Sequence, residues 1–98
     1  MTYRITNSAY DDLEKIWLYT AENWSLKQAD KYINLIMDGI ELIAENPAIG
    51  RDRRSLRMGY FSFNIESHVI FYKIPEEYVE IIRVLHQKMD LESNLLKG

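Results

Sequence analysis

The segment Trp24-Ser25-Leu26-Lys27-Gln28 lies between two stretches of helical periodicity and determines how they are joined. Ser25 and Gln28 have the spacing of a capping box, in which the serine oxygen accepts a hydrogen bond from the Gln28 amide and the glutamine reaches back. The second helix therefore starts after almost no loop. Two helices joined by so short a turn must pack as an antiparallel hairpin.

Apolar residues recur at helical spacing on both sides of this turn. Upstream, the pattern predicts a helix over about residues 8–23, with Asn7 or Ser8 as its N-cap. Downstream, it predicts a helix that ends near Asn46, because Pro47 disfavours a helical conformation in the residue before it. The apolar positions are Ala9, Leu13, Ile16, Trp17 and Trp24 upstream, and Ala29, Tyr32, Ile33, Ile36, Ile40 and Ile43 downstream.

The remaining sequence is typical of β-strands. Residues 3–6 form a short alternating segment, and further segments rich in β-branched and aromatic residues cover 60–65, 69–72 and 78–85. The breaks between the last three segments are short, so these segments are predicted to form an antiparallel meander.

The element order β-αα-βββ predicts an α+β fold, which we expect to be one domain over residues 1–98. The helical hairpin is expected to pack on one face of a small, twisted, mainly antiparallel sheet, with residues 3–6 at its edge. A short C-terminal helix is compatible with residues Asp90 to Leu96. The opposite face of the sheet is expected to stay open, and an exposed apolar face marks a site for a partner peptide that packs a helix or adds a strand.

The composition excludes several classes of site. The chain contains no cysteine, which removes disulfides, thiolate nucleophiles and cysteine-type zinc sites. Two histidines, His68 and His86, give poor support for a metal site without thiols, and we expect neither a metal nor a cofactor. The N-terminus lacks the features of a signal peptide, and no apolar run approaches the roughly 20 residues of a membrane helix. We therefore expect a cytoplasmic protein without a membrane partner.

The charge of the chain is uneven. The net charge is −3, whereas a protein that grips nucleic-acid backbone is normally basic. Four arginines nevertheless lie close together in the loop between Gly50 and Gly59: Arg51, Arg53, Arg54 and Arg57. Guanidinium groups make forked contacts with carboxylates and phosphates. This arginine loop is the best candidate for an anion or acidic-partner site, and its plainer role is that of a solvated connection.

Arg83 and His86, at the end of the last predicted strand, raise the question of ribonuclease chemistry. Cleavage of RNA through its own 2′-hydroxyl needs a base, an acid and cations, and His68 could add to such a site. The pattern favours structural roles for these residues. We expect Arg83 to point to the same side of the sheet as Ile81 and Leu85, with its head paired to a carboxylate.

An ordered set of short motifs resembles the ParE branch of the RelE/ParE toxin superfamily, from Tyr3 to about Leu95. Each motif is weak alone, and the ordered set is specific. The motifs are Ala9, Asp12-Leu13 and Ile16; Tyr19 and Trp24; Gln28-Ala29 and Tyr32; Asn46-Pro47-Ala48-Ile49-Gly50-Arg51; Gly59-Tyr60; His68-Val69-Ile70-Phe71-Tyr72; Ile82-Arg83-Val84-Leu85-His86; and Met89-Asp90.

The resemblance implies the β-αα-βββ fold and the role of toxin in a type II toxin–antitoxin system. It implies a protein inhibitor rather than an enzyme, one that traps the complex of DNA gyrase with cleaved DNA and blocks replication. A ParD-like antitoxin would neutralise it in a hetero-oligomer. Exposed strand edges and an exposed sheet face also predict that the isolated toxin aggregates or dimerises readily.

Two alternatives stay open. RelE-type and YoeB-like relatives cut mRNA on the ribosome, and Arg83 and His86 would be the catalytic residues of such an endoribonuclease. The chain lacks the lysine-rich middle segment of RelE, and its net charge is unsuited to docking on ribosomal RNA. An inert member of the superfamily would only bind the antitoxin.

Two sets of site residues follow as hypotheses from the resemblance. The surfaces expected to face gyrase, or the DNA bound to it, are the helical hairpin, the arginine loop and the C-terminal segment. The cations assigned to target binding are Arg51, Arg53, Arg54, Arg57, Arg83 and Lys97. The residues expected near an antitoxin groove are Tyr60, Phe71, Tyr72 and Val84.

Overall fold

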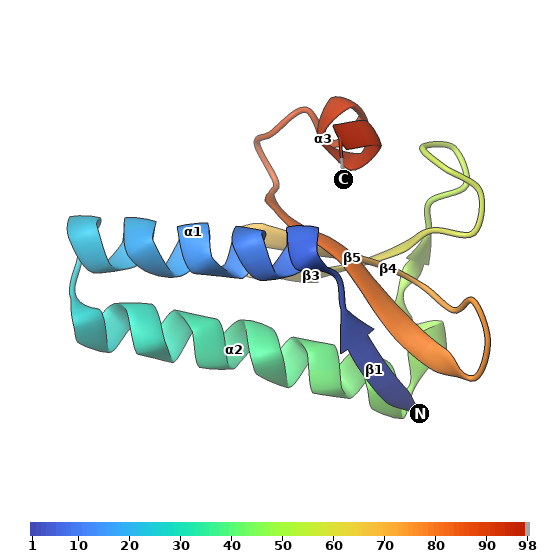
Figure 1. Cartoon of the computed structure of the whole chain (residues 1–98), viewed down its shortest axis with the longest axis horizontal. Coiled ribbons are helices and arrows are strands. Elements are labelled where there is room, and N and C mark those ends of the chain that lie inside the picture. Colours follow the sequence, from blue (N-terminus) through green and yellow to red (C-terminus); the bar gives the residue numbers. More distant parts are fainter. Residues whose placement is uncertain (98) are drawn as a thin grey trace.

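The computed structural model describes residues 1–97, with side chains described as far as Leu95. The elements are β1 (Thr2–Ile5), α1 (Asn7–Asn23), α2 (Leu26–Glu45), the 3-10 turn η1 (Pro47–Ile49), β2 (Arg51–Asp52), β3 (Phe61–Ile65), β4 (His68–Lys73), β5 (Tyr78–His86) and α3 (Leu91–Lys97) (Figure 1). This order confirms the predicted arrangement and adds the short strand β2. Within residues 1–97, no helix combines the length and the apolar character that a membrane span requires.

The strands form one sheet in the order β1-β5-β4-β3-β2. The strands β3, β4 and β5 are the predicted antiparallel meander. β1 pairs in parallel with β5 and takes the edge position expected for residues 3–6. β2, at the other edge, was not predicted from the sequence, and it places Arg51 beside Ser62 of β3. The arginine loop therefore begins on a sheet edge.

Side-chain caps start both helices of the hairpin. Ser25 Oγ accepts a hydrogen bond from the Gln28 amide at 3.0 Å, as the capping box predicts. The predicted cap of α1 is wrong. Thr6, whose backbone is still extended, caps this helix and accepts from the Ala9 amide at 3.1 Å, in place of Asn7 or Ser8. The chain thus passes from β1 into α1 without a separate loop.

The helical hairpin covers one face of the sheet and forms the inner core with it (Figure 1). The buried members of the inner core are Ala9, Leu13, Ile36, Ile40, Ile43, Ile70, Tyr72, Val79, Ile81 and Val84. This layer confirms the predicted packing of the helix pair on a single face.

The opposite face of the sheet is not open, and the prediction that it would be exposed is wrong. α3 lies on the side of the sheet opposite to α2 (Figure 1). An outer cluster is buried there, with Leu56 of the arginine loop and Leu91 of α3 packed against it. Its buried members are Tyr60, Val69, Phe71, Ile82, Leu85 and Leu95. The C-terminal helix and the arginine loop thus supply the apolar side chains that cover this face.

Candidate functional site

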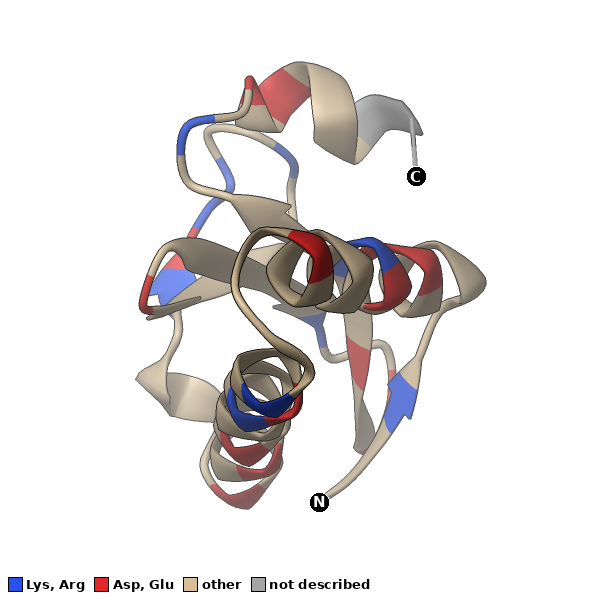
Figure 2. Cartoon of the chain, turned by 90° about the vertical axis from the view of Figure 1, so that its left-hand side faces the viewer, with Lys and Arg blue, Asp and Glu red and all other residues tan. Residues whose placement is uncertain are grey.

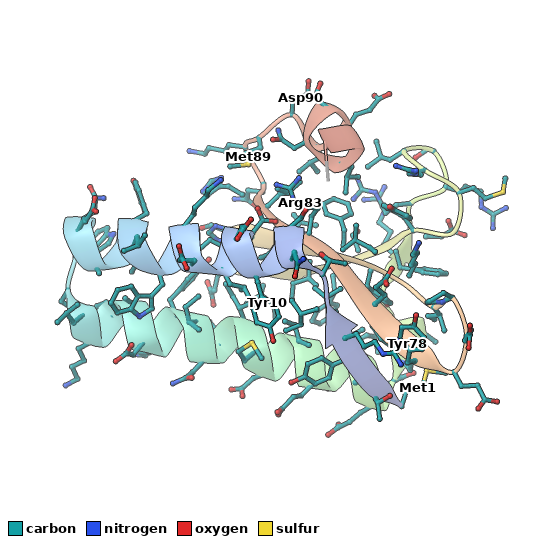
Figure 3. The ribbon with its side chains drawn as sticks, in the orientation of Figure 1. Met1, Tyr10, Tyr78, Arg83, Met89 and Asp90 are labelled. Carbon is teal, nitrogen blue, oxygen red and sulfur yellow. The ribbon has the colours of Figure 1, made fainter. Side chains whose placement is uncertain are left out.

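Arg83 is tied into the interior between α1 and α3 (Figure 3). Its Nε and Nη2 donate to the carboxylate of Asp12 at 2.7 and 2.9 Å, and its Nη1 donates to the Asn94 carbonyl oxygen at 2.7 Å. Hydrogen bonding to Asp12 raises the pKa of Arg83. All three guanidinium nitrogens are therefore engaged within the chain, and this cation does not face a target surface as we had expected.

Asp12 also completes the free edge of β5. β1 ends at Ile5, so the residues of β5 that follow have no strand beside them on that edge. Asp12 Oδ2 accepts a hydrogen bond from the Val84 amide at 2.9 Å, and Thr6 Oγ1 donates to the Ile82 carbonyl at 2.9 Å. Side chains at the start of α1 therefore make the hydrogen bonds to the Val84 amide and the Ile82 carbonyl that a neighbouring strand would otherwise make.

A bulge in β5 changes which face of the sheet its side chains occupy. Ile82 has no partner of its own on β4, whereas its neighbours Ile81 and Arg83 are both paired. An extra residue changes the alternation of side chains along a strand. Ile81 consequently lies in the inner core and Leu85 in the outer cluster. The expectation that these residues and Arg83 would share one face of the sheet is therefore wrong.

His68 and His86 lie side by side across β4 and β5. They are directly paired in the sheet, and their rings meet edge to face with centroids 5.1 Å apart. Tyr32 Oη lies 2.6 Å from His68 Nδ1, and His86 Nδ1 accepts from the Lys88 amide at 3.1 Å. Burial, and after it the neighbouring His86, lower the pKa of His68 to about 4. His68 is therefore a neutral, packed residue at neutral pH.

Two of the four loop arginines are engaged by neighbouring side chains. Arg54 forms a forked ion pair with Asp52, in which Nη2 lies 2.7 Å from Oδ2, and both residues are exposed. Arg53 donates to the hydroxyl of buried Ser62 at 3.2 Å, and its guanidinium lies 5.7 Å from the centroid of the Phe71 ring. Arg53 therefore holds the loop to the sheet.

The other two loop arginines present their charge to solvent. Arg57 is exposed, with its guanidinium 5.5 Å from the centroid of the Tyr60 ring. Arg51 is exposed on β2 and makes no hydrogen bond or ion pair with another side chain of residues 1–95. Acidic positions lie along both helices of the hairpin (Figure 2), whereas residues 50–60 hold four arginines and one aspartate. The loop is thus a positive region on an acidic chain.

The four residues predicted near an antitoxin groove are all buried. Tyr60 and Phe71 lie in the outer cluster, whereas Tyr72 and Val84 lie in the inner core beneath the hairpin. The Tyr72 hydroxyl donates to the Pro47 carbonyl at 2.7 Å. The four residues are thus divided between the two faces of the sheet and do not form one surface. The side chain of Lys97, the last of the predicted target contacts, lies outside the described residues.

An apolar surface on the hairpin was not predicted from the sequence. A groove between α1 and α2 is lined by Tyr10, Leu13, Trp17, Ile33 and Met37, together with Asp11 and Glu14. Further large apolar side chains are exposed along the same helices: Leu18, Tyr19, Trp24, Leu26, Leu35 and Leu42. The sequence does indicate this surface, because the apolar stripes of both helices are wider than one buried face requires.

Comparison with known proteins agrees with this fold. The family model described as ParE toxin of type II toxin-antitoxin system, parDE, matches residues 3–91. The chain is 42% identical over 93 residues to Toxin ParE1 of Caulobacter vibrioides, and the match covers 95% of this chain and 96% of that protein. It is 37% identical over 94 residues to Toxin ParE1 of Mycobacterium tuberculosis, with coverage of 95% and 96%.

A solved structure shows the same fold at lower sequence identity. It is titled "Chromosomal ParDE TA system from P. aeruginosa", and a chain of it superimposes with a TM-score of 0.79 at 18% identity. The match covers 88% of this chain and 95% of that chain. The family match and the identities to curated toxins show that the chain belongs to the ParE toxin family of type II toxin–antitoxin systems.

Proposed function

We propose that this toxin inhibits DNA gyrase by trapping the complex of the enzyme with cleaved DNA, so that replication stops. Membership of the ParE family is the observation that carries the proposal. The inhibitor acts by binding, and the arginine loop with its exposed Arg51 and Arg57 is the positive surface available for the target.

The environment of Arg83 favours an inhibitor over a ribonuclease. A catalytic cation must reach the charge that develops on the scissile phosphate. Arg83 donates hydrogen bonds to Asp12 and to the Asn94 carbonyl oxygen. His86, in contrast, contacts the His68 ring and accepts a hydrogen bond from the Lys88 amide. The two residues therefore have separate partners, and no contact in the described chain joins them into one site.

A ParD-like antitoxin is the partner that we propose for neutralisation, since ParE toxins belong to ParDE pairs. The exposed apolar side chains of the hairpin offer an amphipathic segment of the antitoxin a surface on which to pack. Tyr60 and Phe71 are buried in the outer cluster, so contact with them would require the side chains that cover this cluster to move. Tyr72 and Val84 could support an antitoxin surface only from beneath the hairpin.

The test combines the purified toxin with purified gyrase and plasmid DNA. We expect loss of supercoiling together with accumulation of linear, gyrase-cleaved plasmid, and we expect purified antitoxin to reverse both effects. The control is the same reaction without gyrase, in which the plasmid should remain intact.

Other outcomes would point to the alternative functions. An unaffected gyrase together with mRNA cut on translating ribosomes would establish the endoribonuclease. Unaffected gyrase, intact mRNA and normal growth during overexpression without antitoxin would show an inert member that only binds the antitoxin.

A further inference from the structure

The arginine loop, residues 50–60, has a defined shape. Four backbone hydrogen bonds close it: Arg53 N to Tyr60 O at 2.8 Å, Leu56 N to Arg53 O at 2.9 Å, Arg57 N to Arg53 O at 3.0 Å and Tyr60 N to Arg57 O at 3.2 Å. Leu56 packs against the outer cluster, and Arg53 is bound to Ser62. The loop is therefore anchored at its base and closed at its tip, which lowers the entropy lost when a partner binds it.

The tip of the loop is Arg57-Met58-Gly59. Met58 is 86% exposed, the highest value among the exposed large apolar side chains of the described residues. Gly59 has φ of 84°, a left-handed conformation that glycine adopts readily. A Cβ added at Gly59 would meet no atom within 4 Å, so this conformation, rather than crowding, accounts for the glycine there. The turn thus holds a methionine away from the body of the protein.

Met58 and Arg57 are neighbours in the chain, and together they indicate which kind of partner surface the loop tip would bind. Methionine and arginine are both enriched in the cores of protein interfaces, and the flexible thioether adapts to irregular apolar pockets. The fold does not use Met58 in either apolar cluster. An acidic protein surface with an apolar pocket would therefore satisfy both side chains at once.

Duplex DNA fits this surface less well than an acidic protein does. Arg53 and Arg54 are engaged by Ser62 and Asp52, which leaves Arg51 and Arg57 as the free cations of the loop. Two cations would neutralise about two phosphates, and DNA-binding proteins commonly make several times that number of contacts. The chain as a whole carries a net charge of −3 and is repelled by DNA.

We infer that Met58 and Arg57 anchor the toxin on its target protein, with Met58 entering an apolar pocket and Arg57 pairing with a carboxylate beside it. Arg51, at the base of the same loop, adds a second cation. The inference rests on the proposed function, because it takes gyrase as the target.

The absence of cysteine allows a direct test of this contact. Met58→Cys would carry a benzophenone photocrosslinker, and the labelled toxin would be irradiated with gyrase, plasmid DNA and, in a separate reaction, antitoxin. The matched control is Glu77→Cys, an exposed position in the turn between β4 and β5. We expect the Met58→Cys toxin to crosslink to a gyrase subunit, unmodified toxin to compete for it, and the control to give no such product.

The second measurement is inhibition of supercoiling by loop variants. Met58→Asp and Arg57→Glu are each expected to inhibit gyrase at least about tenfold more weakly, as for loss of an interface hot spot. Glu77→Lys lies outside the loop and changes the charge by as much as Arg57→Glu does, with the opposite sign, and it should inhibit like the unmodified toxin. All three positions are exposed, so thermal unfolding should be unchanged. Antitoxin binding should also be unchanged, because the antitoxin is proposed to pack on the helical hairpin.

The outcomes separate the two proposals. If the unmodified toxin inhibits gyrase and the loop variants inhibit equally well, the loop anchor is overturned and gyrase inhibition stands. Crosslinking to DNA alone would replace the protein partner by DNA, and crosslinking to antitoxin alone would make the tip a neutralisation contact. Failure of the unmodified toxin to inhibit gyrase would overturn both proposals.

Discussion

Two side chains, Asp12 and Arg83, connect elements of this toxin that are far apart in the sequence. The carboxylate of Asp12 accepts from both Arg83 and the Val84 amide, and Arg83 also holds the carbonyl of Asn94. One ion pair thus joins α1, β5 and α3. Both side chains are nearly removed from water, so each depends on the other for compensation of its charge.

Replacement of Arg83 by leucine should leave Asp12 buried without a cation. We expect the free energy of unfolding to fall by about 3 kcal/mol, the usual cost of breaking a buried pair from one side. The double variant Asp12→Leu/Arg83→Leu should be more stable than the sum of the single variants predicts, because it removes both charges. Urea denaturation measures all three free energies.

The exposed pair of Asp52 and Arg54 provides the control for this cycle. Removal of Asp52 should leave the denaturation midpoint unchanged, because an exposed pair contributes little. Strictly additive effects of the Asp12 and Arg83 substitutions would contradict a structural role for their ion pair.

At the scale of elements, the connection from α2 to β2 is set by contact with a buried tyrosine. Gly50 follows η1 and lies against Tyr72 of β4, whose hydroxyl is hydrogen-bonded to Pro47. A Cβ at Gly50 would overlap this hydroxyl. Gly39 of α2, in contrast, lies against the flexible end of the Ile65 side chain. The two glycines therefore tolerate a methyl group differently.

Gly50→Ala is expected to destabilise the fold by about 1–3 kcal/mol, the range for an overpacked core. Gly39→Ala should cost less, because Ile65 can move and because alanine favours a helix over glycine by about 1 kcal/mol. Thermal unfolding of both variants, followed by circular dichroism, measures the difference. An equal loss of stability in the two variants would show that contact with Tyr72 does not fix the connection.

For the whole molecule, the titration of His68 links the fold to pH. Its pKa is lowered to about 4 in the folded chain by burial and by His86, whereas an unfolded histidine has a pKa of about 6.5. The folded state therefore binds fewer protons than the unfolded state between these values. This histidine should make the toxin lose stability as the pH falls from about 7 towards 4.

His68→Gln removes this titration and keeps a hydrogen-bonding side chain beside the Tyr32 hydroxyl. We expect its free energy of unfolding to decline less between pH 7.5 and pH 5 than that of the unmodified toxin, by urea denaturation at each pH. Glu66 in the neighbouring turn, Asp12 and His86 are present in both proteins, so the difference between the two pH profiles reports on His68. Parallel pH profiles would show that His68 is not held neutral.

The sequence alone determined the two long helices, the strands of the meander and their order, but not the short strand β2. Ser25 and Gln28 predicted the helical hairpin, and the short breaks around Glu66 and Pro75 predicted the meander, because caps, turns and periodicity act over a few residues. The position of the arginine loop was also predictable. Local patterns were therefore sufficient for the helical hairpin and the meander, but not for the cover on the second face of the sheet.

The tertiary structure alone decided which side chains are free. Asp12 meets Arg83 from 71 positions away in the chain, the bulge at Ile82 changes the face of each later residue, and Leu95 of α3 closes the outer face. No local pattern carries such contacts, since they depend on how distant elements pack. For the same reason the sequence showed four loop arginines, and only the packed structure separated the two engaged ones from Arg51 and Arg57.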